Sequence, residues 1–396
     1  IAQRMSAPSN TPTTIAYFVS AHGFGHAARS TAVMAAIQRR WPEVHCHIFT
    51  QAPGWFFADS LAGPHTCHAM ETDVGLVQRS PLEEDLGQTL SRLDALFPLS
   101  ADRLDTCCRQ VAALSCRLIL CDIAALGIAV AQTLGLPSIL VENFTWDWIY
   151  ARYPVAARYP VAARYPVAAC GSDRNSYSDL TPALQAHARY QAKLYAQASY
   201  RIQAEPVCRP LAADLTVPPV CRQSRVARAL TRRRLGLSID TPLVLVTMGG
   251  TPATYTFLNH LRQEKEICFL LPGLGNALVQ EANVIKMPAR SAFRHPDLIA
   301  AADAVVGKVG YSTLAEIFHA GTPFGFVQRP DFPESPPLAD YIRTRMPAIE
   351  IAPRDFEKGH WISMLRPLLA LPRRPSRTVN GAELIADFVL DRLAAP

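Results

Sequence analysis

The feature that most limits the fold is the alternation of short apolar runs, rich in β-branched residues, with longer amphipathic stretches. Such runs are typical of buried parallel strands, and the stretches between them are typical of the helices that connect those strands. A first series of strands is predicted at Ile15–Val19, Leu118–Cys121, Ser138–Val141 and Arg201–Ala204. A second series is predicted at Leu243–Thr247, Ile267–Leu271, Val284–Met287, Ala304–Val306 and Phe324–Val327. The pattern indicates an α/β protein with two Rossmann-like halves.

The segment between the two series divides the chain. Residues 206–240 are rich in Pro and Arg and contain no strand-like run after their first positions, so we predict a linker there. The predicted organisation is a disordered segment 1–13 with Met5 as a candidate start, an N-terminal domain 14–205, the linker 206–240, a C-terminal domain 241–379 and a terminal helix within 380–396. Apolar residues at 385, 386, 389, 390 and 393 have the spacing of one helix face.

Residues 151–168 are three identical copies of the hexapeptide Ala-Arg-Tyr-Pro-Val-Ala. A proline every six residues opposes both a continuous helix and a central strand, so we predict a loop. Exact identity favours a recent duplication over a designed Tyr/Arg binding surface, and we expect one copy to suffice.

Composition excludes several classes of protein. With 49% hydrophobic and 18% charged residues, the 396-residue chain can bury a large core and is not a disordered protein. It lacks the run of about 18 apolar residues that a membrane-spanning helix needs, and a cytoplasmic location is expected. None of the ten cysteines forms a CxxC pair, so we interpret them as buried free thiols. The pairs His45/His47 and His65/His68 would need further ligands to form a metal site, so we interpret them as ordinary strand and loop histidines and assign no metal.

The net charge of +6 is concentrated at 222–234 and 366–377. The excess is not spread along one periodic face, so it favours an anionic substrate or a lipid surface over nucleic acid.

A glycine-rich loop follows the first predicted strand, with the sequence Ser20-Ala-His-Gly-Phe-Gly-His26-Ala-Ala-Arg29-Ser30. Gly23 and Gly25 allow a tight turn and close approach of the backbone to a ligand, and the helix start offers N–H groups to anions. The loop matches neither the Walker A motif nor the GxGxxG fingerprint. His26 stands at the helix entrance, where its imidazole can face a cleft; the alternative is a histidine that caps or packs at the turn.

A second strand, loop and helix motif has the sequence Asp303-Ala-Val-Val-Gly-Lys308-Val-Gly310-Tyr-Ser312-Thr313-Leu-Ala-Glu316. Gly310, Ser312 and Thr313 can donate hydrogen bonds to a diphosphate, and Lys308 adds positive charge. Glu316 lies one turn into the helix and can accept hydrogen bonds from ribose hydroxyls. The structural alternative is a Thr313–Glu316 capping box.

Three further groups are weaker candidates. Gly249, Gly250 and Thr251 end the first strand of the second half and face the first loop across the presumed cleft. Asp122, at the end of a strand, is a second candidate for the base or for the partner that orients His26; a loop-capping role is the alternative. Trp146, Asp147 and Trp148 can form an acceptor wall that stacks on sugars, or can pack in the core.

Three motifs together carry a resemblance to a known family. They are His22-Gly-Phe-Gly-His26-Ala-Ala-Arg29-Ser30, Glu142-Asn-Phe-Thr-Trp-Asp147-Trp-Ile-Tyr150, and Val306-Gly-Lys-Val-Gly-Tyr-Ser-Thr-Leu-Ala-Glu316 through Phe332-Pro-Glu334-Ser335. They resemble the glycosyltransferase-like domain of L-arabinokinases and, more distantly, the MurG-type N-acetylglucosaminyltransferases. The resemblance covers most of residues 14–393 and implies the GT-B fold, in which two Rossmann-like domains with parallel sheets face a central cleft.

The resemblance also implies roles for individual residues. His26 corresponds to a candidate general base, Glu316 to the acid that holds the donor ribose, and Glu334 with Ser335 to the pair that contacts the donor sugar. Arg29 and the glycines of the first loop then lie on the acceptor side. Phe24 in the first loop, and Glu-Ser in place of Gln-Gln, depart from the MurG pattern and leave the donor sugar open.

The predicted function is transfer of a sugar from a nucleoside-diphosphate sugar, expected to be UDP-linked, to a hydroxyl acceptor with inversion. The chain has no Asp-x-Asp pair, so a metal-independent mechanism without a cofactor is expected. The acceptor can be a glycan, a lipid or a small molecule, and a lipid would imply peripheral membrane contact. A non-catalytic nucleotide-sugar-binding or regulatory module and a nucleotide-sugar 2-epimerase are the alternatives.

Overall fold

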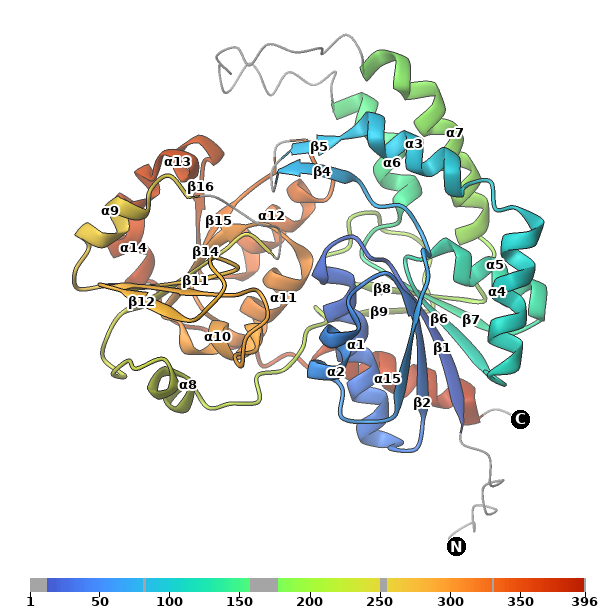
Figure 1. Ribbon diagram of the computed structural model, residues 1–396, viewed down its shortest axis with the longest axis horizontal. Helices are drawn as coiled ribbons and strands as arrows, with labels where there is room; N and C mark the ends of the chain where they lie inside the picture. The colour runs from blue at the N-terminus through green and yellow to red at the C-terminus, as the bar shows by residue number, and fades with distance from the viewer. Residues whose placement is uncertain (1–12, 81–82, 157–176, 250–254, 330, 395–396) are drawn as a thin grey trace, which may run out of the picture.

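The computed structural model describes residues 13–80, 83–156, 177–249, 255–329 and 331–394. It contains two lobes, each built on a seven-stranded sheet with helices packed on it (Figure 1). The first sheet is parallel throughout, and its strands lie in the order β3 (His65–Ala69), β2 (His45–Thr50), β1 (Thr14–Val19), β6 (Leu118–Asp122), β7 (Ser138–Glu142), β8 (Tyr200–Ala204) and β9 (Leu215–Val217).

The second sheet has the order β12 (Val279–Glu281), β13 (Val284–Met287), β11 (Cys268–Pro272), β10 (Leu243–Thr247), β14 (Ala304–Lys308), β15 (Phe324–Val327) and β16 (Ala348–Ile351). Only its β12–β13 pair is antiparallel among the strands that the structure describes. A separate hairpin is formed by β4 (Val77–Ser80) and β5 (Glu83–Asp85).

The helices connect and cover the strands. In the first lobe they are α1 (Phe24–Arg40), α2 (Gly54–Ser60), α3 (Leu86–Leu96), α4 (Ala101–Ala113), α5 (Ala125–Leu134), α6 (Trp146–Ala156) and α7 (Tyr177–Tyr195). The later helices are α8 (Arg228–Arg234), α9 (Leu258–Gln263), α10 (His295–Ala301), α11 (Tyr311–Ala320), α12 (Ser335–Arg345), α13 (Pro353–Lys358), the 3₁₀ helix η2 (His360–Met364), α14 (Leu365–Leu369) and α15 (Gly381–Ala394).

Both sheets change winding direction at a central strand. In the first sheet, β2 and β3 lie on one side of β1, and β6 lies on its other side. In the second sheet, β11 lies on one side of β10, and β14 lies on its other side. Ligands of open α/β sheets bind at such switch points, outside the carboxyl ends of the strands. The loops after β1, β6, β10 and β14 are therefore the ones that position a site.

Every strand predicted from the sequence is present, with ends that shift by two residues at most. Each of these strands is largely buried, which is why their apolar runs were visible in the sequence.

The predicted linker differs from the structure. Residues 206–240 contain the edge strand β9 and the helix α8, so the passage between the lobes is shorter than predicted. The C-terminal helix α15 returns to the first lobe and packs against α1 (Figure 1). Along the described residues, the chain therefore passes from the first lobe to the second and returns to the first at α15.

The prediction of a loop for the hexapeptide repeat was wrong for the first copy. Residues 151–156 continue α6, which begins upstream at Trp146. The buried residues Trp146, Ile149, Tyr150 and Tyr153 recur at helical spacing, and this apolar face outweighs the unfavourable proline at 154. The copies at 157–168 lie outside the described residues.

Other features agree with the composition. The nine described cysteines are free, and all except Cys67 are buried. The histidine pairs lie on the adjacent strands β2 and β3, where His47 Nδ1 is 3.2 Å from His68 Nε2. Within the described ranges, we find no helix with the length and apolar character that a membrane span requires.

Candidate active site

The glycine-rich loop after β1 turns sharply into α1. Gly23, the residue before the helix, has a φ of 67°, a backbone conformation that favours glycine. The helix then places His26 and Arg29 one turn apart on one face. Val19, at the end of β1, is paired with Asp122 at the end of β6. The side chains of His26 and Arg29 therefore both reach Asp122 at the switch point.

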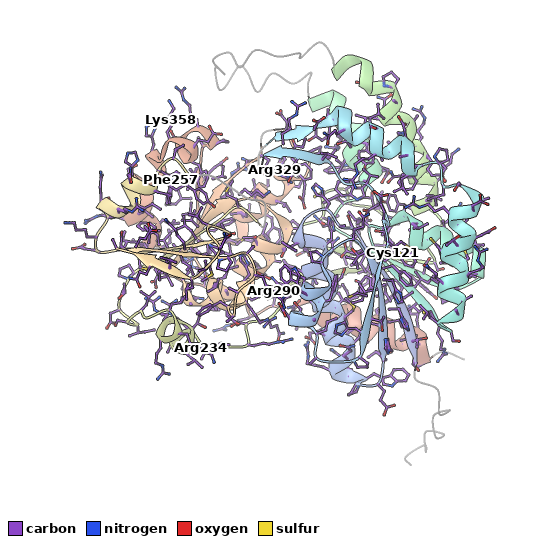
Figure 2. All side chains as sticks on the ribbon, in the orientation of Figure 1. Cys121, Arg234, Phe257, Arg290, Arg329 and Lys358 are labelled. Carbon is purple, nitrogen blue, oxygen red and sulfur yellow. The ribbon has the colours of Figure 1, made fainter. Side chains whose placement is uncertain are left out.

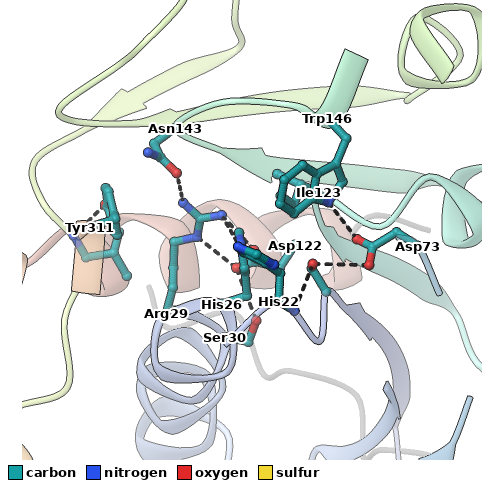
Figure 3. A network of polar contacts seen from close by, with 12 residues as sticks. His22, His26, Arg29, Ser30, Asp73, Asp122, Ile123, Asn143, Trp146 and Tyr311 are labelled. Atoms are coloured by element: carbon teal, nitrogen blue, oxygen red, sulfur yellow. Dashed lines mark hydrogen bonds and ion pairs between the residues drawn. The ribbon is translucent and has the colours of Figure 1, made fainter. Parts of the chain in front are cut away.

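Asp122 is the centre of a buried polar network (Figure 3). Its Oδ1 lies 2.8 Å from His26 Nδ1, and its two oxygens accept hydrogen bonds from Arg29 Nη2 at 2.6 Å and Nε at 2.8 Å. Ser30 Oγ also donates to Oδ2, at 3.2 Å. The carboxylate is fully buried, and burial alone would raise its pKa; the charge and hydrogen bonds of Arg29, with His26, hold the pKa of Asp122 below its ordinary value.

The residue after Asp122 has an unusual backbone. Ile123 has a φ of 48°, which is rare for a β-branched residue and is strained. Such strained positions cluster at functional sites, where the surrounding structure holds them. The observation supports Asp122 as a functional residue rather than an ordinary loop cap.

A cavity of about 250 Å³ lies between the two lobes. The predicted site residues that line it are Gly23, Gly25, His26, Arg29, Gly249, Lys308, Gly310, Ser312, Thr313 and Glu334. The two glycine loops lie face to face, because a Cβ added to Gly25 would be 3.9 Å from the Cβ of Ser312. Gly250 and Thr251 lie outside the described residues.

The second lobe presents the start of α11 to the cavity. Gly310 is the residue before the helix, and Ser312 and Thr313 are in its first turn. The Thr313–Glu316 capping box is not formed: α11 has no side-chain cap, and Glu316 has other partners among the described residues. The backbone N–H groups of this turn are therefore available to an anion.

Lys308, at the end of β14, lies beside this turn. Gly249 has a φ of 72°, and a Cβ there would be 3.3 Å from Lys308 Cε, so glycine lets the two segments approach closely. Burial, together with the positive charge of Arg329, lowers the pKa of Lys308 to about 7. An anion bound here would restore full protonation of the amine.

Glu316 does not line the cavity. Its side chain is buried, and its oxygens accept hydrogen bonds from Arg222 Nε at 3.1 Å and from His295 Nδ1 at 2.6 Å. Burial opposes ionisation, but Arg222 and His295 hold the pKa of Glu316 below its ordinary value. Arg222 and His295 themselves line the cavity, so it is they that face a ligand, with Glu316 behind them.

Glu334 and Ser335 lie at the start of α12 and have different environments. Glu334 lines the cavity; its Oε1 accepts a hydrogen bond from Asn143 Nδ2 at 2.9 Å, and its Oε2 is 3.7 Å from Arg329 Nη2. Ser335 Oγ instead accepts from the backbone N–H of Arg329 at 3.0 Å and does not line the cavity. Ser335 fixes the turn, whereas Glu334 faces the ligand space. Figure 2 shows Arg329 and Arg290 in the second lobe, near its boundary with the first.

The predicted aromatic acceptor wall is not formed in the structure. Trp146 is fully buried in the core and donates a hydrogen bond from Nε1 to Asp73 Oδ2 at 3.1 Å. Asp147 is paired with Arg209 at 3.2 Å, and neither Trp146 nor Asp147 lines the cavity. The apolar face of α6 places these residues in the core, which was the alternative interpretation of the motif.

Sequence reasoning missed several residues that line the cavity: Asn143, Arg222, His295, Arg329 and Phe332. Asn143 directly follows β7. A polar residue at the carboxyl end of a strand is a sequence signal for a site residue, and this signal could have identified Asn143. Arg222 belongs to the basic run that was assigned to the linker, and no local pattern distinguishes it from its neighbours.

The chain is similar in sequence to one part of a much longer known protein. No protein-family model matches the chain. L-arabinokinase from Arabidopsis thaliana is 28% identical over 386 residues, which are 96% of this chain and 34% of that protein. The chain therefore spans about a third of the length of this curated relative.

Solved structures resemble the whole chain. LpCGTa, solved in complex with UDP, has a TM-score of 0.61 with 13% identity, covering 98% of this chain and 100% of that one. A UDP-glucosyltransferase from Polygonum tinctorium has a TM-score of 0.59 with 12% identity, covering 98% of this chain and 99% of that one. The chain has the GT-B fold, and the resemblance to GT-B proteins and to L-arabinokinase is confirmed. The likeness to MurG-type enzymes stays a prediction.

Proposed function

We propose that the protein is a glycosyltransferase that moves a sugar from a nucleoside-diphosphate sugar to a hydroxyl acceptor, with inversion at the anomeric carbon. The observation that carries this proposal is one cavity with two facing walls. His26, hydrogen-bonded to Asp122, lies on one wall, and the start of α11 with Lys308 lies on the other. Transfer needs a base at the acceptor and stabilisation at the leaving diphosphate, and the two walls offer one each.

The base is His26. Asp122 accepts a hydrogen bond from Nδ1–H of His26, so Nε2 is the ring nitrogen left to act as the base. Nε2 takes the proton of the acceptor hydroxyl as its oxygen bonds to the anomeric carbon, while the bond from that carbon to the diphosphate oxygen breaks. Attack opposite to the leaving group inverts the configuration.

The leaving diphosphate departs with its negative charge held by Lys308 and by the N–H groups of the first turn of α11. These groups are supplied by the protein itself, which supports a mechanism that needs no metal. Glu334, Arg222 and His295 all line the cavity, which supports a role for Glu334 at the donor sugar and for Arg222 and His295 at the nucleoside end. UDP is the expected nucleotide because LpCGTa, which has this fold, was solved in complex with UDP, and the Polygonum tinctorium protein of the same fold is a UDP-glucosyltransferase. A hydroxyl acceptor, a cytoplasmic location and peripheral membrane contact stay predictions.

We expect UDP or a UDP-sugar to raise the thermal stability of the protein. A ligand at 100 times its Kd adds about 2.7 kcal/mol to the free energy of unfolding. Thermal unfolding against UDP, GDP, dTDP, ADP and their sugar conjugates measures this, with Lys308→Met as the variant that should lose the shift.

The outcomes separate the alternatives. Stabilisation by a nucleotide sugar without turnover of any acceptor would indicate a non-catalytic binding module. Conversion of the donor alone to a second sugar nucleotide would indicate an epimerase. If no nucleotide stabilises the protein, the donor site on α11 is wrong.

Binding of the diphosphate should also take up a proton. Because the pKa of Lys308 is lowered to about 7 in the free protein, its amine is mostly neutral at about pH 8. A bound diphosphate raises that pKa, so close to one proton is taken up at this pH, and affinity falls as the pH rises above 7. Calorimetric titration with UDP in buffers of different ionisation enthalpy measures the uptake. Lys308→Met should abolish it, and uptake that persists in this variant would assign the proton elsewhere.

A further inference from the structure

A continuous chain of hydrogen bonds joins the base on the first lobe to Glu334 on the second. His26 Nδ1 bonds to Asp122, and Arg29 holds Asp122 through Nε and Nη2. Arg29 Nη1 donates to Asn143 Oδ1 at 2.6 Å, and Asn143 Nδ2 donates to Glu334 Oε1 at 2.9 Å. Figure 3 shows the first four of these residues. The chain therefore crosses the cleft through Asn143.

Every member of the chain is buried. The exposed fraction is 7% for His26, 0% for Asp122, 1% for Arg29, 1% for Asn143 and 5% for Glu334. Water cannot easily replace a lost partner at this depth, so each hydrogen bond constrains its neighbours.

The chain also has a fixed direction. Arginine only donates and an ionised carboxylate only accepts, so the amide oxygen of Asn143 must face Arg29 and its NH₂ must face Glu334. Arg29 in turn fixes the plane of the Asp122 carboxylate, which orients His26. Rotation of the Asn143 amide would break the bonds on both sides.

We propose that Asn143 is a positioning residue that couples donor-sugar recognition at Glu334 to the orientation of His26. This inference rests on the proposed function. Glu334 lines the cavity, and its Oε2, which lies 3.7 Å from Arg329 Nη2 and does not bond to Asn143, can accept a hydrogen bond from a sugar hydroxyl. Such a hydrogen bond holds the Glu334 side chain in one position. Because Asn143 bonds to both Glu334 and Arg29, it then also constrains Arg29 and Asp122. The imidazole of His26 is therefore held in its orientation when a sugar is bound to the second lobe.

Kinetics of Asn143→Ala tests the coupling. We expect kcat to fall about 10- to 100-fold, as for misplacement of a reacting group, with the Kd for UDP unchanged. Asn283→Ala is the matched control, because Asn283 donates to three backbone carbonyls of the second lobe and does not line the cavity. Its kcat should stay at the wild-type value.

Two further variants keep the test decisive. Asn143→Asp serves if Asn143→Ala fails to fold. It retains the shape of the side chain but turns a carboxylate toward Glu334, and its kcat should fall by a similar factor. In the double variant Asn143→Ala/Glu334→Gln, kcat should be no lower than in the worse single variant, because both act through one chain. Losses that multiply would overturn the proposal.

A ligand-free measurement separates this proposal from the proposed function. Glu334→Gln should shift the His26 imidazole resonance in a histidine-labelled NMR spectrum, and Asn143→Ala should abolish that shift. If no donor is turned over by the wild-type protein, the proposed function fails, and the NMR result alone decides the coupling. The proposed coupling is rejected if Glu334→Gln does not shift the His26 resonance, or if it shifts the resonance equally in the Asn143→Ala background.

Discussion

His26→Ala is expected to lower kcat for glycosyl transfer by about 10²- to 10⁴-fold, the range that a positioned general base contributes. The Kd for UDP should change little, because the diphosphate is held by the opposite wall of the cavity, at Lys308 and α11. Steady-state kinetics together with calorimetric UDP binding measures both quantities. Asp122→Asn should lower kcat in the same direction, since an amide in its place no longer fixes the tautomer of His26.

His319→Ala is the control for the loss of a partly buried, hydrogen-bonded histidine. His319 Nε2 bonds to the carbonyl of Pro219 at 2.8 Å, outside the cavity. Its kcat should remain near the wild-type value. A His26→Ala protein that keeps wild-type kcat would remove His26 as the base and favour a second group on the same loop, such as His22, which also lines the cavity.

The fold was predictable where strands are buried on both faces. β10 and β15 were found with their observed bounds, because apolar runs of this length have few alternatives. The missed strands β2 and β3 carry histidines and threonines in place of an apolar run, and β9 is only three residues long. Short or polar strands such as these are stabilised by pairing with a neighbouring strand, and the local sequence does not show that neighbour.

The site was predictable where a loop follows a central strand. His26, Asp122 and Lys308 could be proposed from the sequence because Asp122 and Lys308 end β6 and β14, and His26 lies in the first turn of α1, just after β1. Whether a residue faces the cavity depends on partners distant in the sequence. Glu316 is withdrawn from the cavity by Arg222, 94 positions away, and Trp146 by Asp73, 73 positions away.

The largest effect on stability is expected for Arg29→Met, which should lower the free energy of unfolding by about 3–5 kcal/mol at neutral pH. Methionine is close to arginine in length, but it leaves the Asp122 carboxylate buried without its main counter-charge. Chemical unfolding monitored by fluorescence measures the loss. Arg39→Met is the matched control on the same helix: Arg39 pairs with Glu383 but its side chain is 51% exposed, so its loss should be below about 1 kcal/mol.

The pH dependence of this loss identifies Asp122 as its cause. In the wild-type protein Arg29 overcomes burial and keeps the pKa of Asp122 below its unfolded value, so this group contributes stability that is present above the unfolded pKa and lost as the pH falls through the folded one. In Arg29→Met burial dominates and the pKa of Asp122 rises, so the carboxyl takes up a proton at a higher pH. The stability difference between the two proteins should therefore shrink as the pH is lowered, and the double variant Arg29→Met/Asp122→Leu should recover part of the loss at neutral pH. A difference that is constant with pH, or a double variant less stable than Arg29→Met, would attribute the loss to packing around Tyr311 instead of the buried charge.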